Sequence, residues 1–293
     1  YDTLFRGQGG EAPLNPLTSK RRTNMELNDY QSRRVMLDEG YAEAAWHSDI
    51  GSRDTQEDSL RISEHHLTLL ATVCDGMGGF DAGEVASRTA IGYLHDRFEE
   101  TPYSDCRFFK NVLEGMDAAV YDLKDAGGRR LGTGTTVASV MLSGRRLYYL
   151  SVGDSRVYLL RSGELVQTTR DHNYGEELLD LLAQERITQA QFEAEALDYD
   201  GLTSYIGMGG VALSDCNEEP VILRDGDVLL VTSDGLYNAV PIETITQALS
   251  ESTAVEATKA LLRELAAHPF DPRDNTSFIV IRYHKRPNAR SLS

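Results

Sequence analysis

The sequence predicts an α+β protein in which antiparallel β-sheets pack face to face and helices lie on the outside. Short runs rich in Val, Leu, Tyr and Thr, separated by Ser-Gly and Asp-Gly turns, are typical of strands joined by hairpins. Longer amphipathic segments come in groups instead of following every strand, which argues against a strictly alternating parallel sheet.

The first half of the folded region is expected to hold two strands, two helices and then a β-rich tract. The amphipathic segment 82–100 is assigned as a helix because its apolar residues recur on one face. A second helix is expected over 105–125. The expected strands are 42–50 and 67–74 before the helices, and 135–142, 146–152, 156–160 and 164–168 after them. Ser143-Gly144 and Ser162-Gly163 separate the later strands as hairpin turns.

Residues 172–217 differ from the tract before them. They are acidic and partly helical, with helices expected over 175–184 and 188–196, and we interpret them as an insertion over the β framework. The elements expected after this insertion are strands 221–223, 228–233 and 277–283 and helices 241–250 and 254–268.

Charge and composition limit the classes of partner. The 293 residues carry 46 acidic and 29 basic side chains, a net charge of −17, which argues against a nucleic-acid binder or an anionic membrane surface. No apolar run approaches the roughly 18 residues of a membrane span. The three cysteines lack metal-site spacing and suggest reduced thiols, hence a cytoplasmic protein.

The chain divides into a leader, one domain and a tail. Residues 1–40 sum to zero charge and contain Gly and Pro breakers, so we expect a flexible leader or linker there. Residues 41–285 form the predicted domain, with the insertion at about 172–217, and residues 286–293 form a C-terminal tail.

Four aspartates share one local pattern, in which a carboxylate stands at the end of an apolar strand beside Gly, Ser or Asn. They are Asp75, Asp154, Asp234 and Asp274. Any one of them alone is more often a turn or cap residue, but the repetition argues for a common purpose. Carboxylates that converge from separate strands cannot all stay ionised without a cation, and hard divalent metals prefer such oxygens. Glu57 and Asp58 extend the set, and Arg53 lies four residues before them.

An ordered series of motifs resembles the metal-dependent serine/threonine protein phosphatases of type 2C, in their bacterial branch. The series spans about residues 42–283. It consists of Arg53-x-x-x-Glu57-Asp58, Asp75-Gly-Met-Gly-Gly79, Gly132-Thr-Gly-Thr-Thr136, Val152-Gly-Asp-Ser-Arg156, Thr169-Arg-Asp-His172, Ser233-Asp-Gly-Leu236 and Asp274-Asn275.

The resemblance implies a central β-sandwich flanked by helix pairs (α/β/β/α) with a dinuclear metal centre at one end. It implies two Mn²⁺ or Mg²⁺ ions and a third, looser one. The implied roles are a bridging ligand (Asp75), a carbonyl ligand (Gly76), further ligands (Glu57, Asp234, Asp274), a third-site ligand (Asp154), a phosphate-binding group (Arg53) and supporting residues (Asp58, Asn275). Residues 172–217 would be a mobile flap beside the cleft.

The implied reaction is hydrolysis of phosphoserine and phosphothreonine by a water between the two metals, without a phosphoenzyme. Asp75, Asp234 and Arg53 would carry it. The implied substrate is a phosphorylated protein, the product of a serine/threonine kinase, and we expect a monomer with no nucleic-acid partner and no membrane insertion.

The sequence also departs from the family pattern. Met77 and Phe80 stand where members often carry His, and Asn238 stands where Asp is frequent. These departures keep a second interpretation open, a degenerate phosphatase-like domain that binds a regulatory partner or phosphopeptide without catalysis. The intact acidic positions favour the enzyme. A cysteine phosphatase is excluded, because no cysteine is followed by Arg at the required spacing.

Overall fold

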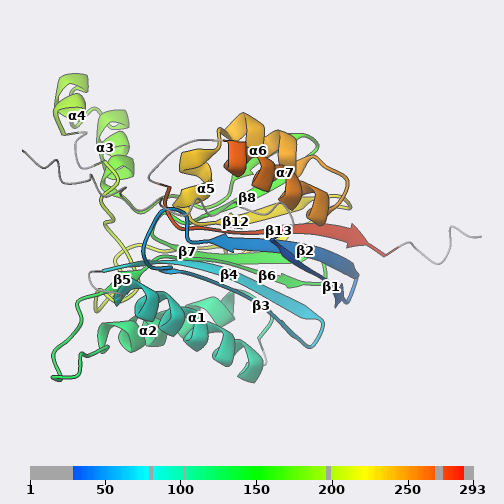
Figure 1. The fold of residues 1–293 in the computed structure, drawn as a ribbon, viewed down its shortest axis with the longest axis horizontal. Helices are drawn as coiled ribbons and strands as arrows, with labels where there is room; N and C mark the ends of the chain where they lie inside the picture. The colour runs from blue at the N-terminus through cyan, green and yellow to red at the C-terminus, as the bar shows by residue number, and fades with distance from the viewer. Residues whose placement is uncertain (1–28, 79–81, 102, 196–198, 268–272, 287–293) are drawn as a thin grey trace, which may run out of the picture.

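Two antiparallel sheets pack on each other and carry helices on both outer faces (Figure 1). The computed structural model describes residues 29–78, 82–101, 103–195, 199–267 and 273–286. The first sheet, in spatial order, contains β1 (Gln31–Leu37), β2 (Gly40–Asp49), β13 (Thr276–Lys285), β12 (Val228–Thr232), β8 (Arg156–Arg161) and β9 (Glu164–Gln167). The second contains β10 (Asp215–Cys216), β7 (Arg146–Val152), β6 (Val137–Ser143), β4 (Thr68–Met77) and β3 (Asp58–His65), with β11 (Val221–Ile222) beside β7 and β5 (Gly134–Thr135) beside β4.

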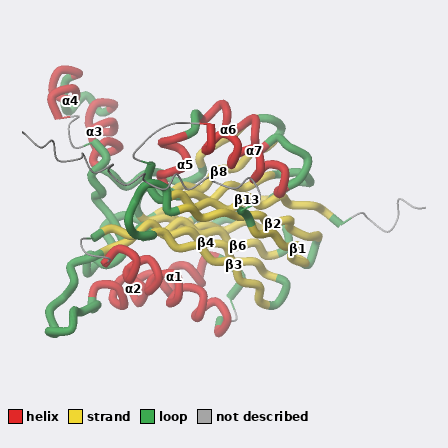
Figure 2. The backbone as a smooth tube through the Cα atoms, in the orientation of Figure 1, coloured by secondary structure: helices red, strands yellow, loops and turns green. Residues whose placement is uncertain are grey.

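Helices form the two outer layers, so that the predicted four-layer architecture is confirmed (Figure 2). The second sheet is covered by α1 (Ala82–Glu100) and α2 (Cys106–Tyr121), and the first by α5 (Asp234–Ala239), α6 (Ile242–Leu249) and α7 (Ala254–Ala267). In the described part of the chain, no helix has the length and apolarity needed to span a membrane.

The central strands are buried on both faces, which explains their continuous apolar sequences. In β4, Leu69, Ala71 and Val73 belong to the core between the sheets, while Leu70 and Cys74 pack under the helices. Strand β12 alternates in the same way between the inter-sheet core and the layer beneath α5 to α7. Because both strands are held on two sides, residues at their ends have fixed positions.

The hairpin turns follow the expected chemistry. Gly144 and Gly163 have φ values of 61° and 84°, and Ser162 also has a positive φ of 54°. In the turn 162–163 both central residues have positive φ, and in the turn 144–145 only the first does; both conformations suit a two-residue turn between twisted strands. Strands β6 and β7 and strands β8 and β9 are accordingly antiparallel neighbours.

The boundary of the leader at residue 40 was wrong. Residues 31–37 form β1, which pairs with β2 and buries Val35 and Leu37 in the inter-sheet core. Four of the seven β1 residues are polar and exposed, as suits an edge strand, and this hid the strand in the sequence. The rest of the expected leader, residues 1–28, lies outside the described residues, as does the tail from 287 onward.

Strand β3 and helix α5 were also absent from the sequence prediction. Strand β3 is an edge strand of the second sheet. Most of its residues are half-buried, so its sequence shows no clear alternation of apolar and polar residues. Helix α5 has six residues, too few for a periodic signal. The second predicted helix, 105–125, is shorter than expected and ends at Tyr121, where Asp122 is the C-cap.

Helices α3 (Tyr174–Ala183) and α4 (Gln189–Glu195) confirm the helical character predicted inside 172–217. They stand apart from the sandwich, at one end of it (Figure 1). No residue of α4 is buried.

A buried histidine makes the stability of this fold pH-dependent. His95 on α1 is fully buried, and its two ring nitrogens contact Ser63 Oγ and Thr72 Oγ1 at 2.9 and 3.1 Å. Burial, helped by the nearby charge of Arg61, lowers the pKa of His95 from 6.5 to about 3. Below pH 6.5 the unfolded chain therefore binds a proton at His95, whereas the folded chain does so only near pH 3. The free energy of unfolding consequently decreases as pH falls from 6.5 toward 3.

We predict that His95→Gln removes part of this pH dependence. At pH 5 the linkage corresponds to about 2 kcal/mol, so the gap in unfolding free energy between wild type and variant should shrink by about that amount between pH 7.5 and 5. Urea unfolding at the two pH values measures the gap. The exposed His66→Gln variant is the control, and a gap that stays constant with pH for His95→Gln would contradict the assignment.

Candidate metal centre

Asp75 stands near the end of β4, which lies between β6 and β3 in the second sheet. Its backbone N–H donates to Thr136 Oγ1 at 2.9 Å, and its carbonyl accepts from Thr136 N at 2.8 Å and Thr135 Oγ1 at 2.8 Å. The last two residues of Gly132-Thr-Gly-Thr-Thr136 thus fix the main chain of Asp75 from one side.

Asp234 reaches the same region from the other sheet. It is the first residue of α5, directly after Ser233 and the buried strand β12. Ser233 Oγ donates to Asp58 Oδ2 at 2.8 Å, and Asp58 pairs with Asp75 across β3 and β4. A single hydroxyl therefore joins the carboxylate-bearing ends of the two sheets.

Asn275 organises the loop that carries Arg53 and Glu57. Its side-chain amide donates to the carbonyls of Ile50 at 2.8 Å and Thr55 at 3.1 Å, and its Oδ1 accepts from Glu57 N at 2.8 Å. This agrees with the supporting role expected from its position beside Asp274.

Close main-chain approach requires glycine at two positions beside Glu57. A Cβ on Gly76 would lie 2.1 Å from the carbonyl oxygen of Gly83 and 2.7 Å from that of Glu57. A Cβ on Gly83 would lie 2.5 Å from Glu57 Oε1. The Glu57 side chain is therefore packed against the start of α1, next to the main chain of Gly76.

The carboxyl groups strongly perturb one another. Burial raises the pKa of Asp75 well above 3.8, and the charges of Asp58, Asp234, Asp154 and Asp274 add to the effect. Burial likewise raises the pKa of Asp154 to about 7, with Asp234 as the next cause. The pKa values of Asp58 and Asp234 are raised by burial too, even though Ser233 donates to Asp58. The structure thus gathers buried carboxyl groups whose ionisation is opposed by burial and by one another.

Arg53 is the cation that this cluster does contact. Its Nη2 lies 2.6 Å from Asp274 Oδ2, and about half of the Arg53 side chain is exposed. The residue expected to hold phosphate is therefore paired with a residue expected to hold metal.

The donor set fits divalent cations. Asp58 Oδ1 and Asp234 Oδ1 are buried without a hydrogen-bond partner, and carboxylate oxygens are the ligands that Mg²⁺ and Mn²⁺ prefer. Within the described ranges, no three His, Cys, Asp or Glu side chains close around one point on their own. Within the cluster, the carboxyl groups repel one another and Asp274 pairs with Arg53.

Sequence reasoning missed several residues that hold the cluster in place. Ser233 and Thr136 lie inside the quoted motifs, so their position next to Asp234 and opposite Asp75 was available as a signal. Tyr237 donates to the carbonyl of Asp154 at 3.0 Å, and nothing in the sequence distinguishes it from a core aromatic.

The structure describes two of the three residues that depart from the family pattern. Asn238 donates from Nδ2 to Asp234 Oδ2 at 3.1 Å, so an amide at this position supports the cluster without adding charge. Met77 lies beside Gly134, with its carbonyl accepting from Thr133 Oγ1 at 2.7 Å. Phe80, for which we expected a place at the rim of the cleft, lies outside the described residues.

The fold and the acidic cluster are those of a two-sheet sandwich with a candidate metal site, and known protein families were compared with this chain. The model of the protein phosphatase 2C family matches residues 47–268. The chain belongs to the protein phosphatase 2C family.

Individual relatives are bacterial phosphatases. The chain is 35% identical over 239 residues to the serine/threonine protein phosphatase PstP of Mycobacterium tuberculosis, covering 78% of this chain and 42% of PstP. The chain thus spans about two fifths of the length of that curated relative.

Solved structures agree on the fold. The serine/threonine phosphatase of S. agalactiae is 26% identical with a TM-score of 0.72, and the match covers 83% of this chain and 99% of that one. The catalytic domain of PstP in complex with two manganese ions is 29% identical with a TM-score of 0.64, covering 83% and 99%.

The carboxyl cluster gives the metal-free protein a pH dependence opposite in sign to that of His95. A folded-state pKa raised above the unfolded value contributes stability below the unfolded value, near 3.8, and loses it as pH rises through the folded value. In the presence of chelator, the cluster should therefore weaken the fold as pH rises from about 3.8 to about 7, the folded-state pKa of Asp154.

We predict that Asp75→Asn stabilises the chelated protein at pH 8 by about 2 kcal/mol, because it removes one buried charge from the cluster. The same variant should gain less stability than wild type from added Mn²⁺. Thermal unfolding with EDTA and with Mn²⁺ measures both effects. Asp96→Asn, which removes an exposed carboxylate on α1, serves as the control, and equal shifts in the two variants would count against a cation site at Asp75.

Proposed function

We propose that this chain hydrolyses phosphoserine and phosphothreonine in phosphorylated proteins, with two Mn²⁺ or Mg²⁺ ions and a third, looser ion. The observation that carries the proposal is the carboxylate cluster at the open end of the sandwich, with two buried oxygens left without partners. Membership of the protein phosphatase 2C family supports the same reaction class. The intact cluster favours catalysis over the alternative of a domain that only binds a partner.

The chain's own residues divide the work between the two sheets. Asp75 and Glu57 come from the second sheet and the loop before it, and Asp234 and Asp274 flank β12 and β13 of the first. Together with the Gly76 carbonyl they would hold the cations, which supply Lewis-acid activation of water and neutralise phosphate charge. Asp58 and Asn275 fix the positions of these groups through Ser233 and the Glu57 main chain.

Arg53 binds the substrate in this proposal. A guanidinium can donate two parallel hydrogen bonds to phosphate oxygens, and the half-exposed side chain lies next to Asp274, where the phosphate would approach. The product of a serine/threonine kinase is the substrate class that this chemistry requires. We further propose a cytoplasmic monomer as its working form.

The test of the reaction is phosphate release from a phosphothreonine peptide. Wild type should be active with Mn²⁺ and inactive with EDTA. Asp234→Ala should retain less than about a tenth of the wild-type kcat, a loss of more than about 1.4 kcal/mol of barrier lowering. Full turnover in EDTA, or a trapped covalent phosphoenzyme, would refute the proposed reaction.

Arg53→Ala should mainly raise KM for the phosphopeptide, since a contact made equally in ground and transition states affects binding and not kcat. The control is Arg97→Ala, which removes an arginine of equal exposure (54%) that also pairs with one carboxylate, on α1. Steady-state kinetics separates the two parameters. A fall in kcat at constant KM would assign Arg53 to the transition state instead of to phosphate binding.

A further inference from the structure

The loop that carries Asp154 is attached to the Asp75 strand. We call residues 153–155, between β7 and β8, the Asp154 loop. Gly153 has a φ of +95°, and a Cβ there would lie 2.7 Å from Thr136 Cγ2, so the loop packs tightly against Thr136. Ser155 Oγ and Thr136 Oγ1 share a hydrogen bond of 2.7 Å, and Thr136 Oγ1 also accepts from Asp75 N.

The same loop is attached to the helix that begins with Asp234. Tyr237, one turn along α5, donates from its hydroxyl to the carbonyl of Asp154 at 3.0 Å. The charge of Asp234 raises the pKa of Asp154, so the two carboxylates repel each other, and the Tyr237 hydrogen bond is an attractive contact between their main-chain supports.

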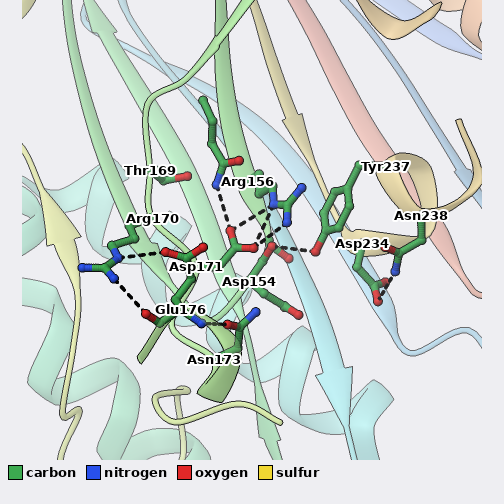
Figure 3. A network of polar contacts seen from close by, with 12 residues as sticks. Asp154, Arg156, Thr169, Arg170, Asp171, Asn173, Glu176, Asp234, Tyr237 and Asn238 are labelled. Carbon is green, nitrogen blue, oxygen red and sulfur yellow. Dashed lines mark hydrogen bonds and ion pairs between the residues drawn. The ribbon is translucent and has the colours of Figure 1, made fainter. Parts of the chain in front are cut away.

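Arg156 holds Tyr237 in that position (Figure 3). Its guanidinium carbon lies 3.6 Å from the centroid of the Tyr237 ring. Its Nε and Nη2 donate to the carboxylate of Asp171 at 2.9 and 2.5 Å, and its Nη1 donates to Tyr158 Oη at 3.0 Å. Stacking on one side and a bidentate pair on the other leave this side chain little freedom.

Asp171 in turn stands at the entrance to the segment 172–217. The next residue, His172, donates from its N–H to the Gly153 carbonyl at 2.9 Å and accepts at Nδ1 from Gly153 N at 3.1 Å. Arg170 pairs with Glu176 at 3.1 Å and with Asp180 at 2.7 Å, both on α3. Contacts therefore run without a break from α3 to the Asp154 loop.

We propose that Arg156 and Tyr237 are positioning residues that hold Asp154 at the metal centre and couple its position to the base of the segment 172–217. The inference rests on the proposed function, since Asp154 matters only if cations bind there. It assigns the network in Figure 3 to cation binding and peptide recognition, beyond the stability that any buried ion pair provides.

A matched pair on the same strand tests whether Arg156 is only a structural clamp. Arg161, at the other end of β8, makes the same bidentate contact with Asp227 at 2.5 Å, and the two arginines are 24% and 25% exposed. Arg156→Lys and Arg161→Lys each remove a bidentate contact with an aspartate and should both lower the unfolding temperature, although only Arg156 also stacks on Tyr237. We expect only Arg156→Lys to weaken Mn²⁺ binding measured by calorimetry and to raise KM for the phosphopeptide, with KM for p-nitrophenyl phosphate unchanged.

Tyr237→Phe is a milder variant that keeps the ring under Arg156 and removes only the hydroxyl. Loss of one hydrogen bond should weaken Mn²⁺ binding about threefold to tenfold. The control is Tyr283→Phe, another buried tyrosine whose hydroxyl donates to a main-chain carbonyl, that of Glu39 at 3.3 Å. If Arg156→Lys fails to fold, the comparison of Mn²⁺ affinity between Tyr237→Phe and Tyr283→Phe tests the inference.

The inference is overturned if Mn²⁺ affinity is unchanged in Tyr237→Phe and Arg156→Lys, or changes equally in the controls. It stands if only these two variants lose affinity. The proposed function is judged separately, on phosphopeptide turnover by wild type. A wild type that binds Mn²⁺ but releases no phosphate would refute the function while leaving the positioning role intact.

Discussion

Repulsion among buried carboxylates is the constraint on which the rest of this molecule depends. Asp75, Asp154 and Asp234 all carry raised pKa values because burial and mutual charge oppose their ionisation. Isolated loops would relieve this repulsion by moving apart. The sandwich prevents that movement, because each carboxylate is attached to a strand or helix whose position is set by a packed core. The two-sided burial of β4 and β12 is therefore a requirement of the site as much as of the fold.

Hydroxyl and amide groups supply the fine positioning that apolar packing cannot. Ser233 joins Asp58 to the opposite sheet, Thr136 fixes the main chain of Asp75, and Asn275 fixes that of Glu57. None of these groups carries charge, so they order the carboxylates without neutralising them. In the proposed function, neutralisation is left to the cations.

The sequence was informative wherever local chemistry repeats and uninformative where contacts cross between sheets. Continuous apolar runs located β4 and β12. The Asp-Gly pattern located Asp75 and Asp234 at the ends of these strands, and the Gly-Asp-Ser pattern located Asp154 after β7. The edge strand β1 escaped because Val35 and Leu37 are its only buried residues. The Arg53–Asp274 pair and the Tyr237–Asp154 contact were unpredictable for a different reason. Their partners lie 221 and 83 residues apart, and no pattern in one segment encodes the other.

The Arg53–Asp274 ion pair has a consequence for how the proposed ligands would bind. If Asp274 holds a cation and Arg53 holds phosphate, as proposed, each ligand competes with this pair. A cation that engages Asp274 frees Arg53 for phosphate, and a phosphate that engages Arg53 frees Asp274 for a cation. The two ligands are thus thermodynamically linked, and each raises the affinity for the other by the same factor. The linkage by itself favours neither order of binding, and both ligands would act on one partly exposed salt bridge.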